Sequence, residues 1–60
     1  MIKHTQIANQ HEVTALTEKA AKFLNTFVGR KLIMSDKEWM SCRMEMGAHK
    51  VWVMGEQTNG

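Results

Sequence analysis

The chain has 60 residues, a single cysteine, no proline and a formal net charge of +2 at pH 7. This length allows one domain over residues 1–60, and so small a domain buries only about 60% of the surface that its unfolded chain exposes. One cysteine excludes an internal disulfide, so we expect a reducing, cytoplasmic setting and a partner as the source of extra stability. The sequence has no run of about 18 apolar residues, so it predicts no membrane-spanning helix and no membrane partner.

The basic and acidic residues are interspersed along the chain, and Arg30 and Lys31 are the one pair of adjacent basic residues. Nucleic-acid-binding proteins usually concentrate positive charge on one face, because their affinity comes from neutralising several phosphates. The composition therefore permits nucleic-acid binding without favouring it.

The first eight residues form no clear pattern, and we expect a flexible lead or an extra helical turn there. The next segment predicts a long amphipathic helix from about residue 10 to 28. Asn9 can cap this helix, Glu12 stands three residues on as in a capping box, and Gly29 follows its end. The apolar residues that recur with a period near 3.6 are Val13, Leu16, Ala20, Phe23, Leu24 and Phe27.

Residues 35–47, SDKEWMSCRMEMG, fit either a helix or a strand. As a helix, the segment has Ser35 as its N-cap, Glu38 to complete a capping box and Gly47 at its end. As a strand, it alternates between apolar and polar residues from Met40 onward. The choice between the two decides the fold class.

The residues that follow favour the strand. Gly47–Ala48 lie between two alternating runs, and glycine in the first position of a two-residue loop is typical of a type II′ hairpin turn. This turn pairs residues 40–46 with residues 49–54 and places Glu45 opposite Lys50. One face of the hairpin is then apolar and carries Met40, Cys42, Met44, Met46, Val51 and Val53.

The sequence thus predicts a small α+β domain, in which one N-terminal amphipathic helix packs on a three-stranded antiparallel meander. The short apolar segment at residues 30–34 is its first strand, and residues 55–60 are a frayed tail. The alternative is a small helical protein with a second helix over residues 36–46.

The residues that could carry chemistry form no recognisable motif. His4, His11, His49 and Cys42 lack zinc-ligand spacing such as C-x-x-C or H-x-x-x-H, so we expect no metal and no cofactor. Cys42 is expected to be a small buried hydrophobe, because a nucleophile needs a paired base and an oxyanion site. With no glycine-rich phosphate loop and no convincing carboxylate pair, we expect no enzyme.

The second face of the predicted sheet is the best functional candidate. Its residues are Trp39, Arg43, Lys50, Trp52 and Met54. Tryptophan, arginine and methionine are enriched in protein interfaces, which favours a binding surface. Two structural alternatives remain open: an exposed cation–π pair of Arg43 with Trp52, and a C-terminal tail folded over this face.

We therefore expect a small protein-binding module, a regulator or inhibitor that docks on a partner protein and forms at least a dimer. Chains of this length are common among accessory genes of phages and mobile elements, an expectation from length alone. The alternative function is nucleic-acid binding, with bases stacked on Trp39 and Trp52. The phosphate-binding residues would then be Arg43, Lys50, Arg30 and Lys31.

Overall fold

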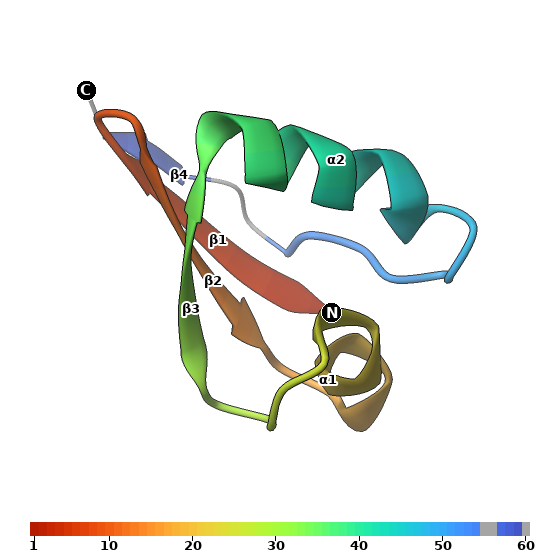
Figure 1. Ribbon diagram of the computed structural model, residues 1–60. Helices are drawn as coiled ribbons and strands as arrows, with labels where there is room; N and C mark the ends of the chain where they lie inside the picture. The colour runs from red at the N-terminus through yellow and green to blue at the C-terminus, as the bar shows by residue number, and fades with distance from the viewer. Residues whose placement is uncertain (55–56, 60) are drawn as a thin grey trace.

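The computed structural model describes residues 1–54 and the backbone of residues 57–59. Its elements in chain order are β1 (Ile2–Ile7), β2 (Gln10–Ala15), α1 (Glu18–Leu24), β3 (Lys31–Ser35), α2 (Asp36–Met46) and β4 (Gln57–Asn59). The strands form one sheet in the order β3-β2-β1-β4, antiparallel except for β4, which runs parallel to β1. Both helices pack on the same face of the sheet (Figure 1). The fold is of the predicted α+β class, but the predicted order of elements is wrong.

The first part of the chain is a strand hairpin and a short helix, not one helix over residues 10–28. β1 and β2 pair across a two-residue turn formed by Ala8 and Asn9. Ala8 adopts a φ of 55° in this turn, a left-handed conformation that costs a residue with a side chain about 1–2 kcal/mol. The side chains that the hairpin buries under the helices are Ile2, His4, His11, Val13 and Ala15.

The hairpin is hidden in the sequence for two physical reasons. Two of its inward positions are the histidines His4 and His11, so the strands lack the alternation of apolar and polar residues that marks a half-buried strand. In addition, Val13 lies in β2 but happens to continue the helical spacing of Ala20 in α1. Residues 1–8, expected to be a flexible lead or a helical turn, contain β1 instead.

The helix α1 is short because both of its ends are capped. Thr17 is the N-cap, and its Oγ1 accepts a hydrogen bond from the backbone N–H of Ala20 at 3.2 Å. Asn25 ends the helix in the left-handed conformation, with a φ of 58°. Phe27, predicted to lie in the buried stripe, comes after this end and is 72% exposed.

The helix α2 replaces the predicted second strand, so both the hairpin of residues 40–46 with 49–54 and the meander are wrong. A capping box starts this helix: Ser35 Oγ accepts from the Glu38 backbone N–H, and Glu38 Oε1 accepts from the Ser35 backbone N–H, both at 3.3 Å. The alternative prediction of a helix over residues 36–46 is confirmed, but its all-helical protein is contradicted by the sheet. The strand predicted at residues 30–34 is confirmed as β3, with its bounds one residue later.

Without the hairpin, the residues predicted to share its faces are separated. Glu45 lies in α2 and Lys50 in the turn that follows, so the two are not cross-strand partners. The predicted apolar face is divided as well, because Met46 and Val51 are buried whereas the other methionines of that face are exposed.

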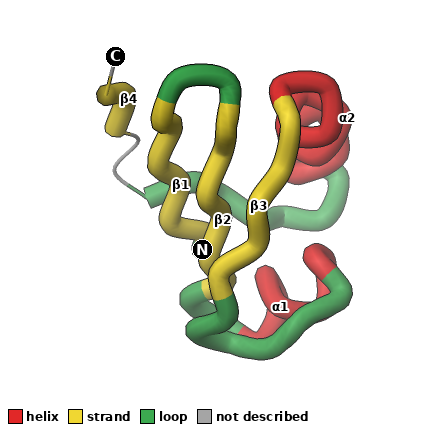
Figure 2. The backbone as a smooth tube through the Cα atoms, turned by 60° about the vertical axis from the view of Figure 1, so that its left-hand side comes forward, coloured by secondary structure: helices red, strands yellow, loops and turns green. Residues whose placement is uncertain are grey.

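The core lies between the helices and the inner face of the sheet. Its buried apolar residues are Ile2, Val13, Ala15, Ala20, Ala21, Trp39, Met46 and Val51. After α2 the chain returns beside β1, where the Ile2 backbone N–H donates to Trp52 O at 2.8 Å and the Met54 N–H donates to Ile2 O at 2.9 Å. Among the described residues, no helix covers the opposite face of the sheet (Figure 2).

The C-terminal residues were predicted to form a frayed tail over 55–60. The backbone of Gln57–Asn59 forms β4, which pairs with β1. The described residues do not include Gly55, Glu56 and Gly60, so the prediction of a frayed tail at these three positions lies outside the described structure.

Candidate functional site

Two histidines from neighbouring strands lie against a tryptophan in the middle of the core. His4 on β1 and His11 on β2 are only 2% and 4% exposed. The rings of His4 and Trp39 are stacked, with centroids 4.0 Å apart and planes inclined by 12°. The two imidazole rings lie edge to edge, with centroids 5.1 Å apart and planes inclined by 12°. Trp39 therefore packs on a polar but flat aromatic surface, which gives both contact area and hydrogen-bonding capacity.

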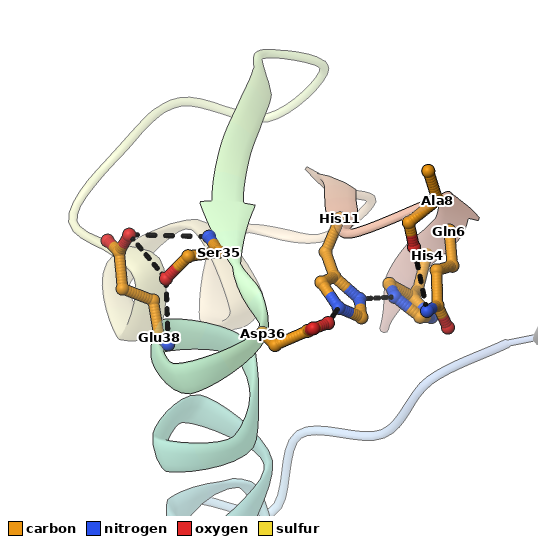
Figure 3. Close-up of polar contacts among 7 residues, drawn as sticks. All are labelled: His4, Gln6, Ala8, His11, Ser35, Asp36 and Glu38. Atoms are coloured by element: carbon orange, nitrogen blue, oxygen red, sulfur yellow. Dashed lines mark hydrogen bonds and ion pairs between the residues drawn. The ribbon is translucent and has the colours of Figure 1, made fainter.

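A series of hydrogen bonds connects this histidine pair to the start of α2 (Figure 3). His4 Nε2 and His11 Nδ1 are 2.8 Å apart, and His11 Nε2 is hydrogen-bonded to Asp36 Oδ1. An ionised carboxylate only accepts, so His11 Nε2 donates to Asp36. When both rings are neutral, His11 Nδ1 is then the acceptor and His4 Nε2–H the donor. The order of donors and acceptors thus fixes the tautomer of both rings.

The cluster of His4, His11, Asp36 and Trp39, which we name the histidine clamp, joins three elements of the fold. Asp36 is the first residue of α2, where a negative charge also interacts favourably with the helix dipole. Its side chain is 60% exposed, whereas both imidazoles are closed to solvent. The described structure gives a substrate no access to these rings. The geometry therefore indicates that this cluster holds α2 on the sheet.

The histidine clamp was not predicted from the sequence. His4 and His11 were considered only for metal binding, and the hairpin that brings them together was not predicted. The signal that could have found them is the turn at Ala8–Asn9, because pairing around it places both histidines on one face. Among the described residues, no group of three or more His, Cys, Asp or Glu side chains is arranged to hold a metal ion.

The five residues predicted to form a binding face are divided between the core and the surface. Trp39 is 3% exposed and belongs to the histidine clamp, so its predicted place on an open sheet face is wrong. The Arg43 guanidinium lies over Trp39, with Cζ 5.9 Å from the ring centroid; the cation–π pair considered from the sequence involved Trp52 instead. Lys50 lies in the turn after α2, with a φ of 55°. Trp52 and Met54 are exposed on the segment that follows.

A surface groove brings together two of the five predicted residues. Arg43 from α2 and Trp52 from the returning segment line it, together with Met44 and Val53. Met40 precedes Met44 by four residues, so the two methionines lie on the same side of α2. We name Met40, Met44 and Trp52 the methionine–tryptophan surface; their exposed fractions are 61%, 83% and 57%. Met40 and Met44 were predicted to belong to an inward-facing strand face, which the helix contradicts.

The single thiol is not an activated nucleophile. Burial raises the pKa of Cys42, and the negative charge of Glu45 raises it further. A reactive cysteine needs a lowered pKa, usually from a nearby cation or a helix N-terminus. Cys42 was predicted to lie inside a sheet; it lies instead on α2, half-buried in a groove shared with Phe23 and Met34.

No family model, curated protein or solved structure matches the chain. Among the described residues, neither helix combines the length and the apolar character that crossing a membrane requires.

Proposed function

We propose that the protein is a small, non-enzymatic protein-binding module that docks on a partner through the methionine–tryptophan surface. One observation carries the proposal: Met44 is 83% exposed and lies beside Trp52, itself 57% exposed, in a chain with a very small core. A large apolar side chain left in water forgoes about 1.5–3 kcal/mol of burial. Clustered exposure of this kind supports a partner site rather than a solvated surface.

The chemistry of these side chains suits docking. Methionine is flexible and polarizable, so Met40 and Met44 adapt to the shape of an apolar partner segment. Tryptophan is enriched among the residues that dominate binding energy, so Trp52 is the natural anchor. Small regulators and inhibitors can act by binding a partner protein without catalysing a reaction. We propose that this chain is such a regulator or inhibitor.

Affinity capture with matched variants tests the proposal. The bait is the full chain, and the extract comes from its native host. The test variant is Met44→Ser with Trp52→Ser. The matched control is Val28→Ser, which removes an apolar side chain elsewhere whose exposure, 51%, is close to the 57% of Trp52. Helix content by circular dichroism checks that each variant is folded.

The expected result is one protein recovered by the wild type and by Val28→Ser, and reduced at least about tenfold with the double variant. Equal recovery by the double variant contradicts the proposal, and so does the failure of the wild type to enrich any protein over the double variant.

We do not propose nucleic-acid binding for this chain. Of the two tryptophans expected to stack bases, Trp39 is buried. Of the basic residues expected to bind phosphate, Lys31 is paired with Glu12, with Nζ 3.2 Å from Oε1. These observations weaken the support for a stacking and phosphate-binding face relative to protein docking.

A further inference from the structure

The strand β3 is an edge of the sheet. It pairs with β2 on one side, and no strand among the described residues pairs with it on the other. Figure 2 shows this side of β3 open, with α1 and α2 near its two ends. An open edge presents unpaired backbone groups and is a template for another strand.

The register of the sheet tells which backbone groups face outward. The two residues that flank a two-residue turn, here Ile7 and Gln10, form a hydrogen-bonded pair. Along an antiparallel ladder, hydrogen-bonded pairs alternate with pairs that are not hydrogen-bonded to each other. Gln10 and every second residue after it therefore turn their N–H and C=O toward β1. The intervening residues His11 and Val13 turn theirs toward β3.

The partners of His11 and Val13 on β3 are Met34 and Leu32. The backbone groups of Ile33, which lies between these two partners, consequently point away from β2. The same holds for Ser35, but its N–H already donates to Glu38 Oε1 at 3.3 Å. Ile33 is thus at the centre of the open edge.

The charges around β3 favour one pairing partner. Its first end is basic, with Arg30 and Lys31, and its last end carries Asp36 and Glu38, with Lys37 as the one base among them. Two copies paired antiparallel about Ile33 place Arg30 of each copy opposite Asp36 of the other. Asp36 is 60% exposed even though it is bonded to His11, so it remains open to this contact.

The apolar residues near the edge fit the same arrangement. Ile33 is 52% exposed, and Phe27, which lines a groove with Arg30 at the basic end, is 72% exposed. A second groove lies at the acidic end, where Met34 and Cys42 are among its lining residues. A two-fold axis through Ile33 exchanges the two ends, so Phe27 of each copy approaches the second groove of the other.

We propose that two copies of the chain form a homodimer by antiparallel pairing of β3 with β3, centred on Ile33. This interface is separate from the methionine–tryptophan surface and goes beyond the docking function proposed above. It differs from the expectation drawn from the sequence, in which the dimer forms either through the tryptophan-bearing face or through the flank of the predicted N-terminal helix. In this dimer both copies use the same surface for the contact, as a two-fold dimer requires.

Sedimentation over a wide concentration range tests the dimer. The wild type is expected to change from the 6.9 kDa monomer toward twice that mass as its concentration rises. Ile33→Lys introduces like charges at the axis and should weaken association by roughly tenfold or more. Arg30→Glu, which lies outside the strand, should also weaken it, and salt should weaken the wild type. The control Met44→Lys alters the methionine–tryptophan surface and should dimerise like the wild type.

Amide hydrogen exchange gives the second, local measurement. The Ile33 N–H is expected to exchange more slowly at high protein concentration, whereas the Leu32 N–H, already bonded to β2, should change little. A wild type that stays monomeric at millimolar concentration overturns the proposal. So does a folded Ile33→Lys variant that dimerises as strongly as the wild type, or an Ile33 amide whose exchange is independent of concentration.

Discussion

At the scale of single residues, the histidine clamp contains the most closely interdependent side chains of the core. Removing one member of a buried hydrogen-bonded pair is usually more costly than replacing both by apolar groups, because the remaining partner loses its bond without regaining water. His11 is bonded both to His4 and to Asp36, so its replacement affects two bonds at once.

We predict that His11→Leu lowers the free energy of unfolding by about 2–3 kcal/mol, since it removes two hydrogen bonds from a buried site. The double variant His4→Phe, His11→Leu should lose clearly less than the sum of the two single losses, because the apolar pair still packs under Trp39. Urea denaturation of the four proteins gives the coupling energy. Strict additivity would show that the histidines act independently and that the clamp is not a unit.

Cys42 gives a prediction that follows from its raised pKa. Because burial and Glu45 favour the neutral thiol, alkylation by iodoacetamide at pH 8 should be several times slower than for a free cysteine, and faster in urea. The same effect lowers stability at high pH: above about pH 8.5 the unfolded thiol ionises while the folded one stays neutral, which favours unfolding. A folded chain alkylated at the rate of free cysteine contradicts this account of the site.

At the scale of elements, α2 depends on its first turn more than on an apolar stripe. Only Trp39 and Met46 of this helix are buried, whereas Met40 and Met44 face water. The capping box at Ser35 is therefore the feature that fixes where the helix begins, and the same residue ends β3.

We predict that Ser35→Ala lowers the free energy of unfolding by about 1 kcal/mol, because it removes the side-chain acceptor of the Glu38 N–H. Ser41→Ala, in the exposed middle of the same helix, is the matched control and should be neutral or slightly stabilising, since alanine favours helices. Thermal unfolding followed by circular dichroism compares the two. Equal losses at both positions would mean that the cap does not determine the helix.

How far the sequence predicts this fold depends on which signal each element carries. β3 was predictable because it is a short apolar run with no competing pattern, and the capping box of α2 was visible in the sequence. The exposed methionines of α2, however, stand at alternating positions as they would on a strand face. Gly47–Ala48 has the residue types of a hairpin turn, but in the structure it follows the last residue of α2. Arg43 and Trp52 do line one groove, but the sheet pairing that predicted their proximity does not exist.

At the scale of the whole molecule, the described residues form a single sheet with helices on one face only, and the core contains few large side chains. Trp39 belongs to that core, whereas Trp52 lies at the surface. The two tryptophans should therefore respond in opposite ways to substitution, one affecting stability and the other affecting binding.

We predict that Trp39→Ala costs about 3–5 kcal/mol, because it removes the aromatic ring that covers both imidazoles. In a domain of this size such a loss leaves the chain largely unfolded at room temperature. Trp52→Ala should change stability by less than about 1 kcal/mol, since its side chain is mostly in water. Chemical denaturation of both variants measures the two losses in free energy of unfolding. Similar losses would contradict the assignment of Trp39 to the core and Trp52 to the surface.

The central claim is that a partner protein binds the methionine–tryptophan surface, and methyl labelling of the six methionines tests it most directly. When the captured partner is added to the labelled chain, the methyl signals of Met40 and Met44 should shift or broaden. The signal of Met34, which lies on β3 and does not line the groove of Met44 and Trp52, should stay in place. If the partner binds while Met40 and Met44 are unchanged and Met34 on β3 responds instead, the claim is contradicted and the sheet edge is the docking site.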